Sequence, residues 1–235
     1  MTAAREEILA RIRAAAGPAA TSAEVDAAYA ALPRGYRRAH HDPAGADIVA
    51  LFAERAGDYR AVVERIPADE LPAAVARAVA AIPQVPPSVV PDAGTPGTTD
   101  IPRSVLVPDG LPAEWLAALP PGTELVRDDP PLSPGDLDRV SGVITGCATA
   151  IAETGTVILD HGPGQGRRAL TLVPDFHLVI IQAGQVEADI AGALARLDPA
   201  RPHTLISGPS ATSDIELIRV EGVHGPRNLH ILIVG

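Results

Sequence analysis

The apolar positions near the N-terminus are spaced as on two short helices. A stripe of Ile and Leu predicts a helix over 3–16, which a Gly-Pro pair ends. Thr21-x-x-Glu24 resembles a capping box and predicts a second helix through about Leu32. The mixed-charge segment 34–43 then indicates a linker. We therefore expect an N-terminal helical arm over 1–40, which either docks on a partner subunit or folds against the main body.

From about residue 47, helical and strand-like patterns alternate. Apolar residues at helical spacing predict helices at 46–56, 68–81, 112–119, 134–140 and 186–197. Apolar runs bounded by turn residues predict strands at 59–66, 104–107, 124–127, 142–145, 156–159, 178–182, 204–207 and 229–234. The predicted helix at 134–140 has a clear start in the sequence Ser133-Pro134-Gly135-Asp136, with Ser133 as N-cap and Pro at the first helical position. This alternation predicts an α/β domain whose largely parallel sheet has helices on both faces.

The composition limits which residue types can form the hydrophobic core and which classes of partner the protein can bind. Apolar residues make up 46% of the chain but aromatic residues only 3%, so the core must be built from Ala, Val, Leu and Ile. The formal net charge of −10 argues against a broad basic face for nucleic acid or anionic membrane. All 19 basic residues are arginine, which excludes Schiff-base lysine chemistry and a Walker-type phosphate lysine.

Cys147 is the single cysteine. One thiol forms no intrachain disulfide and supplies too few ligands for an iron–sulfur cluster. The N-terminal residues are charged and lack the apolar core of a signal peptide, and no segment approaches the length of a membrane span. We expect a soluble, cytoplasmic protein without membrane insertion.

A stretch of small residues over 145–156 is the first candidate for binding chemistry. A helix starting near Cys147 would direct free backbone N–H groups at an anion. Glu153, Thr154 and Gly155 form a predicted turn before a strand. The Glu153 carboxylate either acts as a base or nucleophile or accepts hydrogen bonds from loop amides, and the sequence favours neither.

The glycine-rich segment 162–168 follows the same strand. Its G-x-G-x-G spacing differs from the dinucleotide-binding fingerprint. Arg167 or Arg168 could close an anion-binding nest there, although Gly-Pro-Gly strings are more often plain loops.

The C-terminal turns hold the remaining candidates. Ser207, Gly208 and Ser210 follow a predicted strand, the position from which α/β proteins contact ligands, and no serine-hydrolase motif surrounds them. Ser213-x-x-Glu216 is explained as a capping box. His224 lies between Gly residues and precedes Arg227, so we interpret it as a proton carrier or ligand donor. The histidine spacing predicts no metal site, and His177 and His230 are interpreted as core or edge residues.

Four segments occur in an order that resembles one protein family. They are Ile144–Leu159, Leu172–Val179, Ile206–Glu216 and Gly222–Arg227. Together they resemble the lactate utilization protein C family, whose defining unit is the LUD domain, which we place at 41–235. The chain departs from the family at Ala211, where an Arg is frequent, and at Cys147, where a small residue such as Ala is common. Arg219 or Arg227 would have to replace that Arg.

The resemblance implies both a fold and a role. The fold would be a three-layer α/β/α sandwich with a mostly parallel Rossmann-like sheet, similar to the NagB/RpiA/CoA-transferase group. The role would be in oxidising L-lactate to pyruvate beside partner proteins that carry iron–sulfur clusters, with no cofactor bound by this chain.

The leading hypothesis is a cluster-free subunit of a lactate-oxidising system, with a site for a small anionic metabolite at the carboxyl edge of the sheet. His224 and Glu153 would be catalytic, with His224 accepting a hydroxyl proton and Arg227 holding a carboxylate. The other predicted binding residues are Thr154, Gly155, Ser207, Gly208 and Ser210. Two alternatives remain: an assembly or regulatory module that binds a metabolite without turnover, and a transferase or isomerase acting on CoA esters or sugar phosphates.

Overall fold

The computed structural model describes residues 2–17, 20–35, 47–82, 103–212, 220–221 and 225–235. Its contacts divide the chain into two units, Met1–Arg37 and Arg38–Gly235, which are described separately. His224, Arg219 and the predicted capping pair Ser213 and Glu216 lie outside the described residues.

The N-terminal unit contains the two predicted helices, α1 (Thr2–Ala16) and α2 (Ser22–Ala30). The capping box at the start of α2 is present, since the Thr21 hydroxyl accepts from the Glu24 N–H and the Glu24 carboxylate accepts from the Thr21 N–H. The apolar side chains are exposed, with Ile8 at 58% and Tyr29 at 61%. Local hydrogen bonds therefore define these helices more than burial does.

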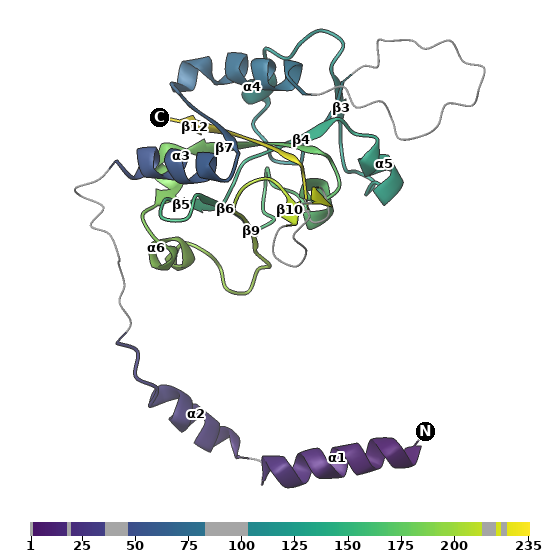
Figure 1. The fold of residues 1–235 in the computed structure, drawn as a ribbon, viewed down its shortest axis with the longest axis vertical. Coiled ribbons are helices and arrows are strands. Elements are labelled where there is room, and N and C mark those ends of the chain that lie inside the picture. Colours follow the sequence, from purple (N-terminus) through teal and green to yellow (C-terminus); the bar gives the residue numbers. More distant parts are fainter. Residues whose placement is uncertain (1, 18–19, 36–46, 83–102, 213–219, 222–224) are drawn as a thin grey trace. The chain divides into compact units, whose positions relative to one another are not determined.

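The larger unit is built on a six-stranded sheet in the order β1-β12-β7-β4-β2-β3 (Figure 1). Every paired neighbour in it is parallel. The strands are β1 (Val62–Ile66), β2 (Ser104–Leu106), β3 (Glu124–Val126), β4 (Gly142–Thr145), β7 (Phe176–Gln182) and β12 (Asn228–Val234). β12 is central and apolar on both faces, because Ile231 and Ile233 enter one core cluster and Leu232 and Val234 the other.

Helices cover both faces of this sheet. On one face, α4 (Leu71–Ala80) and the 3₁₀ turn η2 (Ala113–Leu116) contribute to one core cluster. On the other face, α3 (Ile48–Asp58) inserts Phe52 and Ala56 into the second cluster. The short helix α5 (Pro134–Asp138) begins at the predicted N-cap Ser133, which forms a capping box with Asp136. The predicted α/β class, with a mostly parallel sheet flanked by helices, is confirmed.

A second sheet shares the α3 face and was not predicted. Its order is β8-β5-β6-β9, and β5–β6 and β6–β9 are antiparallel. Its strands are β5 (Thr149–Ile151), β6 (Thr156–Leu159), β8 (Val186–Glu187) and β9 (Thr204–Ile206). The predicted helix near Cys147 is therefore wrong, because the Thr and Ile positions of this stretch pair as β5. The predicted strands at 156–159 and 204–207 exist, but they belong to this smaller sheet.

The remaining elements are short. The helix expected over 186–197 starts later, as α6 (Ile190–Ala195), because Asp189 caps it through a 2.9 Å bond from the Gly192 N–H. Three more 3₁₀ turns, η1 (Ala68–Glu70), η3 (Arg168–Thr171) and η4 (Ala183–Gln185), lie between the larger elements. A two-stranded ribbon joins β10 (Ala211–Thr212) to β11 (Val220–Glu221).

Candidate functional site

A chain of hydroxyl groups connects two of the predicted site residues. Thr154 Oγ1 lies 2.7 Å from Thr156 Oγ1, which lies 2.8 Å from Ser207 Oγ. Thr156 begins β6 and Ser207 follows β9, and the antiparallel pairing of these strands sets the two side by side. The structure thus brings Thr154 and Ser207 together through a buried intermediary that the sequence did not indicate.

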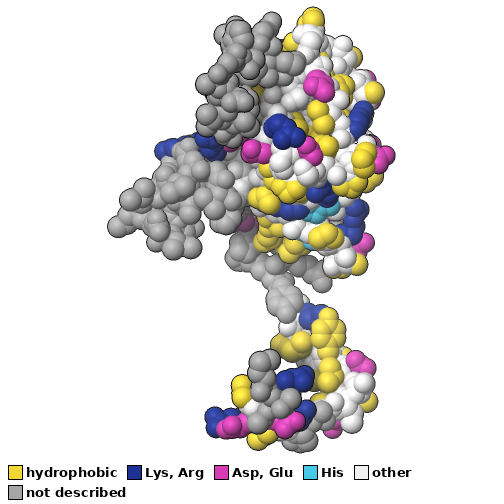
Figure 2. Space-filling view, turned by 90° about the vertical axis from the view of Figure 1, so that its right-hand side faces the viewer, with side chains coloured by type: hydrophobic (Ala, Val, Ile, Leu, Met, Phe, Trp, Pro, Cys, Tyr) yellow, Lys and Arg dark blue, Asp and Glu magenta, His cyan; other side chains and the backbone are white. Residues whose placement is uncertain are grey.

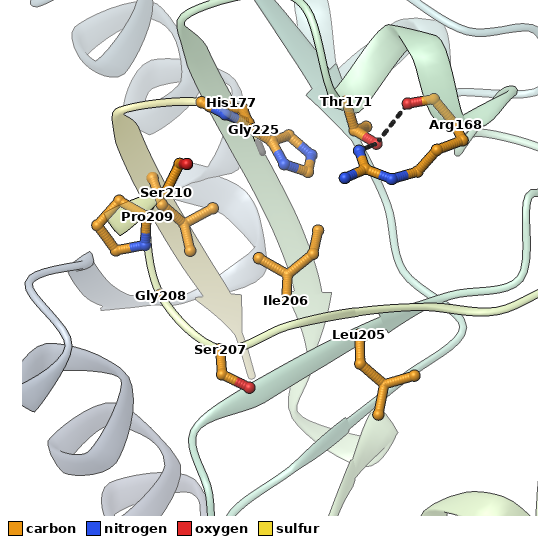
Figure 3. A pocket seen from close by; sticks show the side chains of 12 residues that line it. Arg168, Thr171, His177, Leu205, Ile206, Ser207, Gly208, Pro209, Ser210 and Gly225 are labelled. Atoms are coloured by element: carbon orange, nitrogen blue, oxygen red, sulfur yellow. Dashed lines mark hydrogen bonds between the residues drawn. The ribbon is translucent and has the colours of Figure 1, made fainter. Parts of the chain in front are cut away.

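Ser207, Gly208 and Ser210 also line a pocket of about 200 Å³, which we name the His177 pocket. One wall is the segment 205–210 that ends and follows β9, and another comes from Gly225, Pro226 and Leu229 before and within β12. The rest is formed by Arg168, Thr171 and His177 (Figure 3). Gly225 directly follows His224 in the sequence.

The pocket lies at the amino ends of the central strands. His177 is the second residue of β7 and Leu229 the second residue of β12, and these two residues are paired in the parallel register. We expected the site at the carboxyl edge, and that placement is wrong for this pocket. The expectation failed because Ser207 follows β9, a strand of the small sheet and not of the parallel one.

His177 is a fully buried, uncharged histidine. Its Nε2 lies 2.8 Å from Thr145 Oγ1, and among the described residues its Nδ1 has no hydrogen-bond partner. Burial, helped by the positive charge of Arg168, lowers the pKa of His177 to about 3. The imidazole therefore stays neutral at physiological pH, with one nitrogen as donor and the other as acceptor.

Arg168 supplies positive charge beside this histidine. Figure 3 shows its guanidinium and the His177 ring reaching toward the same space from opposite sides. Arg168 Nη1 lies 3.4 Å from the Thr171 hydroxyl, and burial lowers the pKa of Arg168. A cation, a neutral imidazole and hydroxyls beside apolar Ile206 and Leu229 suit a small anion with a short alkyl group.

Sequence reasoning missed the importance of Thr171 and His177. It treated His177 as a core residue, which is true of its burial, and considered Arg168 only for a nest in the glycine-rich loop. The available signal was a His inside the apolar run Phe176–Ile181 of β7.

Three other predicted residues lie outside the lining of this pocket. Arg227 forms a two-pronged ion pair with Asp175 at 2.5 and 2.8 Å, so it ties together the segments that precede β7 and β12. Gly155 has a φ of +59°, and a Cβ there would lie 2.4 Å from the Ala56 nitrogen, so this glycine permits close approach to α3. The Glu153 N–H donates to the Ala188 carbonyl at 3.1 Å. Their predicted ligand roles stay predictions.

A second pocket, of about 450 Å³, lies where β2 and β3 end, and we name it the carboxyl-edge pocket. Pro108, Gly110 and Asp128 line it together with His161 and the glycine-rich turn. The turn amides bond within the protein: the Gly164 N–H donates to Asp109 O at 2.7 Å, and the Gln165 and Gly166 N–H groups donate to Gly162 O. This turn is therefore no anion nest.

Two polar side chains of the carboxyl-edge pocket, Asp128 and His161, are hydrogen-bonded within the protein. Arg167 donates two bonds to Asp128, at 2.7 and 2.9 Å, which hold the pKa of that carboxyl below its usual range. Both His161 nitrogens have partners at 2.9 Å, Gly166 O and Thr204 Oγ1.

Three broader features bear on ligands and partners. On the face shown in Figure 2, basic and acidic side chains are interspersed, and neither sign forms a continuous band among the described residues. Within those residues, no three His, Cys, Asp or Glu side chains gather as a metal site would require. No helix in the described part of the chain is long and apolar enough to cross a membrane.

Comparisons with known proteins identify the family. Residues 136–234 match the LUD domain family. A lactate utilization protein C from Deinococcus radiodurans is 45% identical over 194 residues, which cover 81% of each chain. One from Bacillus pumilus is 37% identical over 92 residues, 35% of this chain and 38% of that protein. The crystal structure of a DUF162 family protein from D. radiodurans, 37% identical, superposes with a TM-score of 0.60 over 80% of this chain and 97% of that one. The chain therefore belongs to the lactate utilization protein C family, which carries the LUD domain.

Proposed function

We propose that this chain is a component of an L-lactate utilization system and that its His177 pocket holds the small carboxylic acid. The observation that carries the proposal is the relationship to a protein named lactate utilization protein C, at 45% identity over four fifths of both chains. The pocket supports the ligand class, because it places Arg168 and His177 beside apolar residues in a volume of about 200 Å³. A three- or four-carbon acid suits that volume, whereas a CoA ester exceeds it.

The proposed system includes partner proteins that carry iron–sulfur clusters and accept the electrons of the oxidation. The residues of this chain do not fit such a cluster. Its one cysteine, Cys147, is buried, and burial raises the pKa of the thiol to about 12, whereas clusters require several thiolates. The part of this chain in the proposal is to bind and orient the acid.

Growth of a deletion strain tests the role in lactate utilization. A strain of the source organism that lacks this gene should grow on pyruvate and fail to grow on L-lactate, and the wild-type gene should restore growth. Normal growth of the deletion strain on L-lactate would contradict the proposal.

Purification tests the proposed partners. The tagged chain, isolated from cells expressing the whole system, should bring down iron-containing proteins in constant ratio. Recovery of the chain alone at every salt concentration would contradict the partner proposal and leave the growth result to decide the lactate role.

A further inference from the structure

The His177 side chain has an unused hydrogen-bonding atom in a place where such atoms are rare. Its exposed fraction is 0%, and among the described residues Nδ1 has no partner. Buried polar atoms are nearly always hydrogen-bonded, so an orphan in the wall of a pocket points to a ligand atom as its partner. In the carboxyl-edge pocket, by contrast, both nitrogens of His161 are bonded.

The partner of the other nitrogen leaves the position of the proton undecided. Nε2 lies 2.8 Å from Thr145 Oγ1, and a hydroxyl can donate or accept. If Nε2–H donates to Thr145, Nδ1 is an acceptor. If the Thr145 hydroxyl donates to Nε2, Nδ1–H is a donor. Both arrangements keep the interior bond, so the group facing Nδ1 decides between them.

We propose that His177 Nδ1 contacts the 2-position oxygen of small 2-hydroxy and 2-oxo acids, and that the histidine changes tautomer with the ligand. A 2-hydroxy acid donates its O–H to Nδ1, and a 2-oxo acid accepts Nδ1–H at its carbonyl oxygen. The Arg168 guanidinium lies across the pocket from the imidazole (Figure 3), so it can pair with the carboxylate of the acid while Nδ1 contacts the 2-position oxygen. The inference rests on the proposed function for this ligand class.

This arrangement makes one pocket complementary to both members of a hydroxy-acid and keto-acid pair. A fixed Nδ1–H donor could bond the hydroxyl oxygen but would leave the O–H hydrogen of the hydroxy acid without an acceptor at this nitrogen, and a fixed acceptor would repel the carbonyl oxygen of the oxo acid. The neutral state of His177 is what permits the exchange, because a protonated imidazole offers donors only. Thr145 acts here as a positioning residue and does not contact the acid.

Nitrogen NMR of the full-length chain tests the proposal directly. Protein labelled with ¹⁵N-histidine is titrated with L-lactate and, separately, with pyruvate, and the His177 signals are assigned by their loss in His177→Gln. We expect an unprotonated Nδ1 with L-lactate and a protonated Nδ1 with pyruvate. His161 is the internal control, because Gly166 O can only accept and so fixes the proton on its Nδ1.

Substitution of Thr145 provides a second readout. Thr145→Val removes the hydroxyl and leaves an Nε2–H without an acceptor, which favours the tautomer with the proton on Nδ1. L-Lactate affinity should then fall about tenfold relative to pyruvate affinity. Thr145→Ser, which keeps the hydroxyl, should preserve the wild-type ratio.

Three outcomes overturn the inference. The first is the same His177 tautomer with both acids, and the second is an unchanged affinity ratio in Thr145→Val. The third is binding of neither acid at millimolar concentration. The first two outcomes leave the binding of the acid in the His177 pocket standing, whereas the third also removes the acid from this pocket. None of the three decides the growth of the deletion strain on L-lactate, so failure of the tautomer proposal and failure of the lactate role are distinguishable.

Discussion

The His177 pocket and the carboxyl-edge pocket differ in how their polar groups are satisfied. At the carboxyl edge, Asp128 is held by Arg167, and both nitrogens of His161 are bonded. At the amino ends of β7 and β12, His177 keeps one nitrogen without a partner among the described residues. The carboxyl-edge pocket is larger, at about 450 Å³ against 200 Å³. The larger volume and the usual location of sites in α/β proteins favour the carboxyl-edge pocket. The buried nitrogen without a hydrogen-bond partner favours the His177 pocket.

A buried atom without a hydrogen-bond partner, here His177 Nδ1 among the described residues, identifies a site better than the place of a pocket in the fold does. Two consecutive arginines, Arg167 and Arg168, contribute to the two different pockets. The Arg167 guanidinium bonds Asp128 and the Leu132 carbonyl, so it fastens the loops of the carboxyl-edge pocket. Arg168 lines the His177 pocket.

The largest expected effect concerns the turn that closes the carboxyl-edge pocket. Gly110 has a φ of +83°, and a Cβ there would lie 2.7 Å from Pro163 Cβ. Gly110→Ala should lower the free energy of unfolding by about 2–4 kcal/mol, measured by urea denaturation. Gly122→Ala is the matched control, because its φ is +81° and nothing lies within 4 Å. Equal losses in both variants would show that this pocket is not tightly packed.

Substitution of Arg168 should weaken ligand binding and substitution of Arg167 should lower stability, each by about 1.5–3 kcal/mol. Arg168→Leu should weaken L-lactate binding about 10- to 100-fold in calorimetry, because it removes a charged partner of the carboxylate. Arg167→Leu should leave affinity within about twofold but lower stability, because the mostly buried Asp128 loses its partner. Loss of binding in Arg167→Leu with unchanged binding in Arg168→Leu would move the site to the carboxyl edge.

The buried His177 should impose a pH dependence on stability. Its folded pKa of about 3 lies below the usual histidine pKa of 6.5, so between these values the unfolded chain binds a proton that the native chain does not. Stability therefore falls as pH decreases from 6.5 toward 3, by up to about 1.4 kcal/mol per pH unit from this group. His177→Leu should flatten the curve obtained by denaturation across this range. Parallel curves would show that His177 is accessible and charged.

The smallest expected effect is that of Ser207→Ala. It removes the 2.8 Å bond to Thr156 Oγ1 and should cost about 0.5–1.5 kcal/mol of stability. Acid affinity should change less than about threefold, since Ser207 is engaged with the protein. A large loss of affinity measured by calorimetry would make Ser207 a direct ligand contact, as the sequence suggested.

Patterns within short stretches of sequence were enough to predict a core strand and two helix starts. The apolar run of β12 predicts a strand buried on both faces, and the capping boxes at Thr21 and Ser133 are present where the sequence indicated them. The segment over 147–152 was misjudged because small residues fit a helix start as well as a strand, and its partners in β6 and β8 are chosen by tertiary pairing.

The site was less predictable because its contacts join distant residues. His177 meets Thr145 across 32 positions, and Ser207 meets Thr156 across 51. Arg227 was expected to hold a carboxylate, and it holds that of Asp175, 52 residues away. Strand register decides such pairs, and single-sequence patterns do not determine register between strands far apart in the chain.

Binding of L-lactate to wild type and to His177→Leu, measured by calorimetry on the full-length chain, tests the central claim most directly. Near-ultraviolet circular dichroism confirms that the variant is folded. We expect the wild type to bind L-lactate and His177→Leu to bind it at least about tenfold more weakly. Equal affinity in the two proteins would contradict the assignment of the His177 pocket.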